Sequence, residues 1–188
     1  MSQYTSEQLV FVDESGCDTR AGTRKMGWSP RGLTPEKIVL LARSERYSIL
    51  PAYTVEGILT ADVYTGTTDT EVFAAWIEEK LLPRCSRFPA PRSVVVMDNA
   101  SIHHSERITE LFEEAGVVLV YLPPYSPDYN PIEEFFAQLK ACIRKHWCMW
   151  EAGDFGEVFE EFLAWCIRLT GSNDAAARGH FEHCGYSV

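Results

Sequence analysis

The chain has 188 residues, of which 46% are hydrophobic and 12% are aromatic. This length fits one domain with a sizeable core, and the composition excludes disordered and fibrous proteins. Lys and Arg number 17 against 27 for Asp and Glu, which gives a formal net charge of −10. An acidic chain repels a polyanion, so composition alone argues against nucleic-acid binding unless basic residues cluster or a metal ion intervenes.

Apolar runs, the N-terminal residues and cysteine spacing indicate the expected cellular location and domain organisation. No apolar run reaches the roughly 18–20 residues of a membrane helix, so no membrane partner is expected. The polar first residues carry no secretory signal, and the six cysteines include no C-x-x-C pair, which favours an intracellular protein with reduced thiols. We expect one domain over residues 1–188, with 171–188 as a poorly ordered tail.

The first predicted element is a strand at Leu9–Val12, a continuous apolar run typical of strands buried on both faces. Thr68 and Glu71 have the spacing of a capping box, which predicts an amphipathic helix that ends before Pro83. Between these elements, three strand-like runs are typical of antiparallel pairs: Ile38–Leu41, Ser48–Val55 and Ile58–Tyr64.

The second half of the chain alternates strand and helix. Ser93–Met97 and Val117–Leu122 are continuous apolar runs, and a helix capped by Ser105 and ended by Gly116 lies between them.

A Pro-rich loop over residues 123–129 then precedes the longest predicted helix. Asn130 as N-cap and Pro131 at the first helical position open this helix, which continues to about Trp147. A last amphipathic helix covers 155–167. Hairpins followed by alternating helix and strand predict an α/β domain with a mixed sheet.

Two aspartates follow predicted core strands, Asp13 after the first and Asp98 after the Ser93–Met97 run. A carboxylate at a strand end lies where α/β sheets build ligand sites, and its burial is costly unless it is paired or bound to a cation. The alternative is that each aspartate only caps the turn that follows it.

The long helix supplies a third acid. Glu133 lies roughly 100° from Ile132, at the edge of the apolar stripe, whereas Glu134 lies at roughly 200° and is expected to face solvent. Lys140 and Arg144 share the flank of Glu133, where a basic line would suit a phosphate backbone. An ordinary solvated flank explains these two residues equally well.

Three carboxylates brought together from two strand ends and a helix start suit Mg²⁺ or Mn²⁺. Two such ions about 3.5–4 Å apart can clamp the attacking and leaving oxygens of a phosphodiester displacement. Their charge would also make an acidic protein compatible with nucleic acid.

Four segments in chain order resemble the catalytic domain of mariner-like transposases, members of the DDE superfamily of endonucleases. These segments are Phe11–Gly16, Gly27–Gly32, Asp98–His103 and Tyr125–Glu133. Thirty-four residues separate Asp98 from Glu133, as this branch of the superfamily expects. The resemblance covers about Leu9 to Trp147 and implies a ribonuclease H-like fold, with a five-stranded mixed sheet flanked by helices.

The resemblance implies that Asp13, Asp98 and Glu133 are catalytic and hold two Mg²⁺ ions, for which Mn²⁺ substitutes. The reaction would be cleavage of one DNA strand by water, followed by attack of the freed 3′-hydroxyl on a target phosphodiester. The implied partners are a transposon-end or target DNA duplex and a second copy of the chain. A nuclear or nucleoid location is expected if the protein acts on DNA.

The same motifs single out residues beside the acids. Asn99 and His103 match motif positions and would contact the metal ligands or a phosphate, although His103 could instead be a structural histidine under the loop. Arg31 could reach DNA, and Trp28 is expected in the core. His104 has no family counterpart and is expected at the surface.

Other functions remain open. Family members usually carry an N-terminal helix-turn-helix module, for which the position of Asp13 leaves no room. The chain is therefore expected to be a separated catalytic domain, or an inactive or host-retained remnant that binds DNA or protein. A nuclease acting on RNA–DNA hybrids is a further alternative. His180, His183 and Cys184 offer three zinc ligands without a clear fourth.

Overall fold

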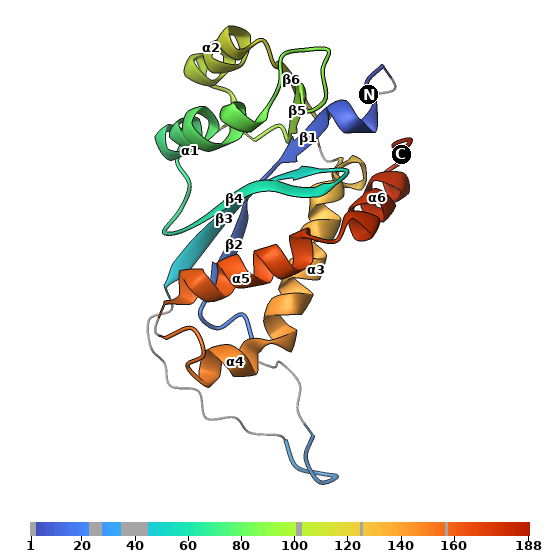
Figure 1. Cartoon of the computed structure of the whole chain (residues 1–188). Coiled ribbons are helices and arrows are strands. Elements are labelled where there is room, and N and C mark those ends of the chain that lie inside the picture. The colour runs from blue at the N-terminus through green and yellow to red at the C-terminus, as the bar shows by residue number, and fades with distance from the viewer. Residues whose placement is uncertain (1–2, 23–27, 35–44, 101–102, 125, 157) are drawn as a thin grey trace.

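The structure is a computed structural model that describes residues 3–22, 28–34, 45–100, 103–124, 126–156 and 158–188. Its centre is one mixed β-sheet (Figure 1). The strands are β1 (Leu9–Val12), β2 (Ser15–Asp18), β3 (Arg46–Thr54), β4 (Gly57–Thr65), β5 (Val94–Met97) and β6 (Val118–Tyr121). β3 pairs antiparallel with β1, β2 and β4, whereas β5 runs parallel to β1 and β6.

β1 and β2 form one line across the sheet, interrupted at Asp13 and Glu14. β3 pairs with both in a single continuous register, which sets Pro51 of β3 opposite Asp13. A proline has no N–H to donate to a ladder. The strand is thus interrupted where the first aspartate lies. If β1 and β2 are counted as one strand, the sheet formed by the described residues has five strands, as the resemblance implies.

Helices cover both faces of the sheet (Figure 1). α1 and α2 pack on one face, and α3, α5 and α6 pack on the other. The helices are α1 (Thr70–Trp76), α2 (Glu106–Ala115), α3 (Pro131–Lys145), α4 (Trp147–Glu151), α5 (Phe159–Gly171) and α6 (Asp174–His183). Shorter helical turns are η1 (Ser6–Gln8), η2 (Ile77–Leu81), η3 (Leu82–Arg84) and η5 (Pro127–Tyr129).

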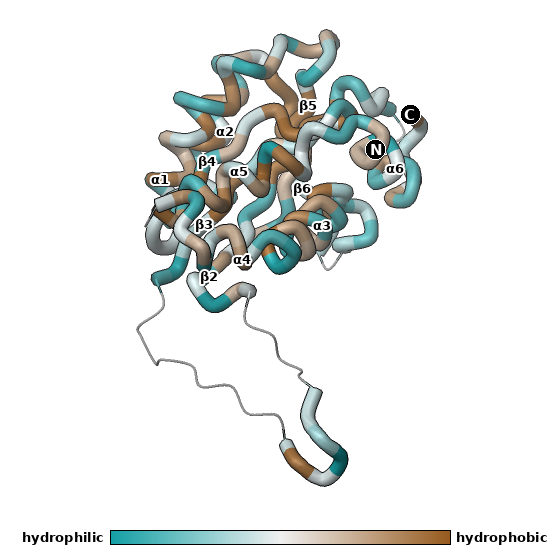
Figure 2. The backbone as a smooth tube through the Cα atoms, turned by 60° about the horizontal axis from the view of Figure 1, so that its bottom comes forward, coloured by the Kyte–Doolittle hydropathy of each residue, from teal (hydrophilic) through white to brown (hydrophobic). Residues whose placement is uncertain are grey.

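The alternation of side chains along β1 builds both cores. Leu9 and Phe11 pack on the side of α3, and Val10 and Val12 pack on the side of α1 and α2. β5 divides its residues in the same way and is strongly hydrophobic (brown in Figure 2). Every residue of these two strands is buried, which confirms the prediction from their continuous apolar runs.

The cap of α2 agrees with the prediction, whereas the cap of α1 differs from it. Ser105 caps α2 as predicted, and Gly116 ends that helix in a left-handed conformation with φ 68°. α1 is capped by Asp69, one residue after Thr68, because the Asp69 carboxylate accepts the N–H of Val72 at 2.8 Å. The threonine of the predicted capping box is therefore not the cap.

The C-terminal segment contains a helix where a poorly ordered tail is expected over 171–188. Asn173 caps α6 by accepting the N–H of Ala176 at 3.1 Å. Ala177 and Phe181 are fully buried in the core on the α3 side of the sheet. Few large apolar residues mark the buried face of α6, so its sequence resembles that of a polar tail.

Residues 28–34 belong to the connection between β2 and β3 and lie away from the sheet (Figures 1 and 2). Trp28, predicted in the core, is fully exposed at 102%. The reason is local: the segment closes its own turn through the N–H of Leu33 and the carbonyl of Pro30, 3.0 Å apart, and does not pack on the core. The predicted strand Ile38–Leu41 lies outside the described residues.

Two further sequence expectations can be compared with the described part of the chain. None of its helices combines the length and the apolar character needed to cross a bilayer. All six cysteines fall within the described residues, and none of them forms a disulfide.

Candidate active site

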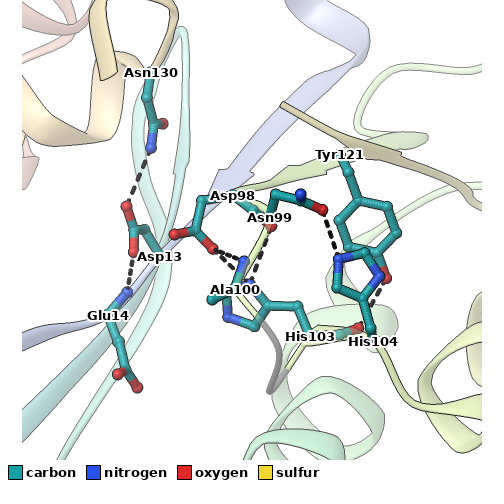
Figure 3. A network of polar contacts seen from close by, with 9 residues as sticks. All are labelled: Asp13, Glu14, Asp98, Asn99, Ala100, His103, His104, Tyr121 and Asn130. Atoms are coloured by element: carbon teal, nitrogen blue, oxygen red, sulfur yellow. Dashed lines mark hydrogen bonds and ion pairs between the residues drawn. The ribbon is translucent and has the colours of Figure 1, made fainter. Parts of the chain in front are cut away.

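Strand register brings the first two acids together. Val12 of β1 lies opposite Met97 of β5 in a parallel pair. Asp13 and Asp98 therefore leave the sheet side by side at the carboxyl ends of neighbouring strands (Figure 3). Glu133, in the first turn of α3, lines the same open pocket of about 480 Å³ as both aspartates. The rest of the pocket wall comes from the loops that follow β5 and β6.

Both carboxylate oxygens of Asp13 accept hydrogen bonds. The N–H of Glu14 donates to its Oδ1 at 2.7 Å, and the side-chain amide of Asn130 donates to its Oδ2 at 3.1 Å. Burial, reinforced by the charges of Asp98 and Glu133 and opposed by the Glu14 N–H, raises the pKa of Asp13 from 3.8 to about 7. A cation in the pocket would lower this pKa, because it favours the ionised carboxylate.

Asn130 has a different role from the one predicted. It occupies the N-cap position of α3, but its side chain makes no capping bond and instead contacts Asp13 (Figure 3). Its Oδ1 is buried and has no hydrogen-bond partner among the described residues. Asn130 thus joins α3 to the strand that carries the first acid. The sequence signal for this contact is an Asn three residues before Glu133. The helix-capping preference of Asn accounts for that residue equally well, so the contact with Asp13 was not predicted.

His103 lies beneath Asp98 and pairs with it. The His103 Nδ1 atom is 2.8 Å from Asp98 Oδ1, and the imidazole stacks on Phe73 with ring centroids 4.6 Å apart. The bond from His103 lowers the pKa of Asp98. Burial alone would lower the pKa of His103, but its bonds to Asp98 and the charge of Asp13 outweigh burial and raise it. Both favour a charged pair that orients Asp98.

Asn99 also lines the pocket and is held by the next histidine. His104 Nε2 lies 2.7 Å from Asn99 Oδ1, and the His104 ring packs against Tyr121 with centroids 4.2 Å apart (Figure 3). His104 is exposed, as predicted, yet it orients a pocket residue. Its role could not be read from the family motif because the motif has no counterpart at this position.

The prediction that Glu134 faces solvent is wrong. It is half-buried and forms an ion pair with His183, because α6 packs against this flank of α3. Glu133 and Glu134 therefore point to different partners, the first to the pocket and the second to α6.

Four basic side chains surround a second, larger groove of about 1250 Å³ between β2 and α3: Arg20, Arg46, Lys140 and Arg144. We call it the basic groove. Its wall includes Ser15, two residues beyond Asp13, so it begins beside the acidic pocket. Arg20 is partly neutralised by Asp18, 2.9 Å away. Arg31 is exposed, and it is not among the described residues that line either pocket.

The donor types of the acidic pocket fit a hard divalent cation. Three carboxylates line an open pocket with room for water and phosphate oxygens, which is the environment that Mg²⁺ and Mn²⁺ prefer. Within the described part of the chain, however, no three His, Cys, Asp or Glu side chains form a ready metal-ligand cluster. The pocket thus contains the ligand types without a preassembled site.

Among the described residues, the suggested C-terminal zinc ligands likewise form no metal-ligand cluster. His180 faces Tyr53 and Gln138, at 2.8 and 2.7 Å. His183 is engaged by Glu134, and burial raises the pKa of the Cys184 thiol to about 11, whereas zinc binds thiolate.

A mixed sheet with acids after β1 and β5 and at the start of α3 is the ribonuclease H-like arrangement expected from the sequence. The family model described as DDE superfamily endonuclease matches residues 8–149. The chain belongs to this family. No curated protein matches the sequence.

Solved structures of Mos1 mariner transposase share the fold. The Mos1 strand transfer complex matches with a TM-score of 0.57 and 17% identity over 97% of this chain and 56% of that chain. The Mos1 paired end complex with Mg gives 0.57 and 16%, over 97% and 57%. The complex with Mn gives 0.56 and 14%, over 96% and 56%. This chain therefore spans little more than half the length of these three Mos1 chains.

Proposed function

We propose that this chain is the catalytic domain of a mariner-like DDE transposase, which cuts and joins DNA with Asp13, Asp98 and Glu133. The observation that carries the proposal is the convergence of these three acids, from β1, β5 and α3, on one pocket. Family membership supports it. The Mos1 complexes with paired ends, Mn and Mg extend it to DNA and divalent cations.

The three carboxylates would hold two Mg²⁺ or Mn²⁺ ions. Such ions, when bound, lower the pKa of the attacking water or hydroxyl and stabilise charge on the phosphate and the leaving oxygen. The protein's own part is to orient the ligands. Asn130 orients Asp13 through a hydrogen bond, and His103 orients Asp98 through an ion pair. Asn99, which lies 2.7 Å from His104 and lines the pocket, would contact a phosphate at its rim.

The basic groove is the proposed path for the DNA backbone. It gathers four cationic side chains beside the acidic pocket in a chain whose net charge is −10. Local positive charge can bind phosphates even when the net charge repels them, since salt screens the distant charges. The transposon end or the target duplex would therefore cross α3 at Lys140 and Arg144 and approach the acids from β2.

A plasmid-nicking assay with Mn²⁺ or Mg²⁺ tests the proposal. The chain, Asp98→Asn and Asp154→Asn would be compared; the last removes one charge from an exposed loop. We expect metal-dependent nicking that Asp98→Asn abolishes and Asp154→Asn retains. Equal nicking by all three proteins, or none by the folded wild type, would contradict it, and the second outcome would favour a DNA-binding remnant. Faster cleavage of an RNA–DNA hybrid would change the proposed substrate.

A further inference from the structure

The C-terminal segment contacts the chain on both sides of Glu133. The Tyr186 hydroxyl donates to the carbonyl of Tyr129 at 2.7 Å. On the other side, His183 of α6 forms an ion pair with Glu134, the residue directly after Glu133. The pocket residues at the start of α3 lie between these two contacts. We call residues 180–186 the C-terminal clasp.

The clasp also contacts the strand that carries the first acid. The Tyr186 ring packs against Phe11 with centroids 5.3 Å apart, and Phe11 lies two residues before Asp13 in β1. Phe181 packs against the same Phe11 ring, also at 5.3 Å. One tyrosine therefore joins β1 to the loop that leads into α3.

A backbone motif sets the position of Tyr186. At the end of α6, the N–H of Tyr186 donates to the carbonyl of Phe181 at 2.9 Å, and the N–H of Gly185 donates to that of Glu182 at 3.0 Å. This is a Schellman motif, with Gly185 in the left-handed region at φ 86°. The expected apolar contact is also present, since the rings of Tyr186 and Phe181 lie 5.8 Å apart.

We propose that Tyr186 is a positioning residue for the active site. By holding the Tyr129 carbonyl, it sets where α3 begins and therefore how Asn130 and Glu133 face Asp13. The inference rests on the proposed function, because it assumes that these carboxylates bind divalent cations. It predicts that loss of the Tyr186 hydroxyl weakens cation binding and lowers kcat but leaves the KM for DNA unchanged, since Tyr186 does not line the basic groove.

The test compares Tyr186→Phe with Tyr47→Phe. Tyr47 also loses one phenol hydrogen bond, to Glu45 at 2.7 Å, but lies on β3 outside the acidic pocket. Mn²⁺ affinity would be measured by titration calorimetry without DNA, and kcat and KM would be measured by nicking. Because groups that orient metal ligands typically contribute 10–100-fold, we expect Tyr186→Phe to weaken Mn²⁺ binding about 10-fold. Wild-type Mn²⁺ affinity in Tyr186→Phe would overturn the proposal.

A second pair of variants tests the backbone motif. Gly185→Ala and Gly153→Ala place a side chain at similar positive φ, 86° and 81°, with no atom in the way of either Cβ. We expect only Gly185→Ala to weaken Mn²⁺ binding, and equal effects would overturn the proposal. If the wild type itself neither binds Mn²⁺ nor nicks DNA, the proposed function fails together with the clasp. If it does both while the variants match their controls, only the clasp fails.

Discussion

Replacing Asp13 by Asn should stabilise the metal-free protein at alkaline pH. Burial and the neighbouring acids raise the pKa of Asp13 to about 7 in the folded state. The folded state therefore binds this proton more tightly than the unfolded state does. Because of this difference, the free energy of unfolding falls as the pH rises from about 4 to about 7 and stays low above it. Asn carries no charge at any of these pH values and escapes this cost.

The magnitude follows from the shift. From 3.8 to about 7, at about 1.4 kcal/mol per pKa unit, Asp13 lowers the free energy of unfolding by about 4 kcal/mol near pH 8, where it is ionised in both states, and by about 2 kcal/mol near pH 5, where it ionises only on unfolding. The Asn side chain can still accept the Glu14 N–H through its oxygen. Its NH₂ group can donate to the Oδ1 of Asn130 if the Asn130 amide rotates by 180°, since that Oδ1 has no partner among the described residues.

Urea unfolding in the presence of a chelator, near pH 5 and near pH 8, measures the effect. We expect Asp13→Asn to exceed the wild type in free energy of unfolding at both pH values, with a margin about 2 kcal/mol larger near pH 8. Asp154→Asn supplies the control, because it removes one charge from an exposed loop. A margin that does not change with pH would refute the reasoning about Asp13.

Three further predictions concern the same pocket and groove. Mn²⁺ at about 100 times its dissociation constant should stabilise the wild type by about 2.7 kcal/mol for each ion bound near pH 8 in urea unfolding, and an equal gain in Asp13→Asn would contradict this. The His103 pKa is raised above 6.5, so His103→Ala should cost most stability below that pH and less as the pH rises through the folded pKa; a pH series of unfolding midpoints checks this, and a constant cost would contradict it. Replacing Lys140 and Arg144 together by Ala should remove about two phosphate contacts. The slope of log K for DNA binding against log[salt], measured by fluorescence anisotropy, should therefore become shallower by about 2, and an unchanged slope would contradict a DNA path through the basic groove.

The positions of the two aspartates could be predicted because strand physics determines them. β1 and β5 are short, continuously apolar and buried on both faces, so their sequences identify them as central strands. An acid directly after each such strand must emerge at the carboxyl edge when the strands are parallel neighbours. Helical periodicity likewise set Glu133 apart from Glu134, although the partner of Glu134 on α6 was not predictable.

Contacts between distant segments could not be predicted in the same way. Asn130 has the local preference of a helix cap, and only the approach of β1 diverts its side chain to Asp13. α6 presents few large apolar residues, so its packing depends on the surface that α3 and the sheet offer. Trp28 illustrates the reverse error, because a large aromatic residue in a segment that leaves the sheet has no core to join.

Anomalous diffraction from crystals soaked in Mn²⁺ tests most directly whether the three acids form a divalent-cation site. We predict manganese peaks in the pocket lined by Asp13, Asp98 and Glu133, and their loss in crystals of Asp98→Asn. A pocket without a peak, or manganese bound only at Glu134 and His183, would contradict a DDE metal site in this chain.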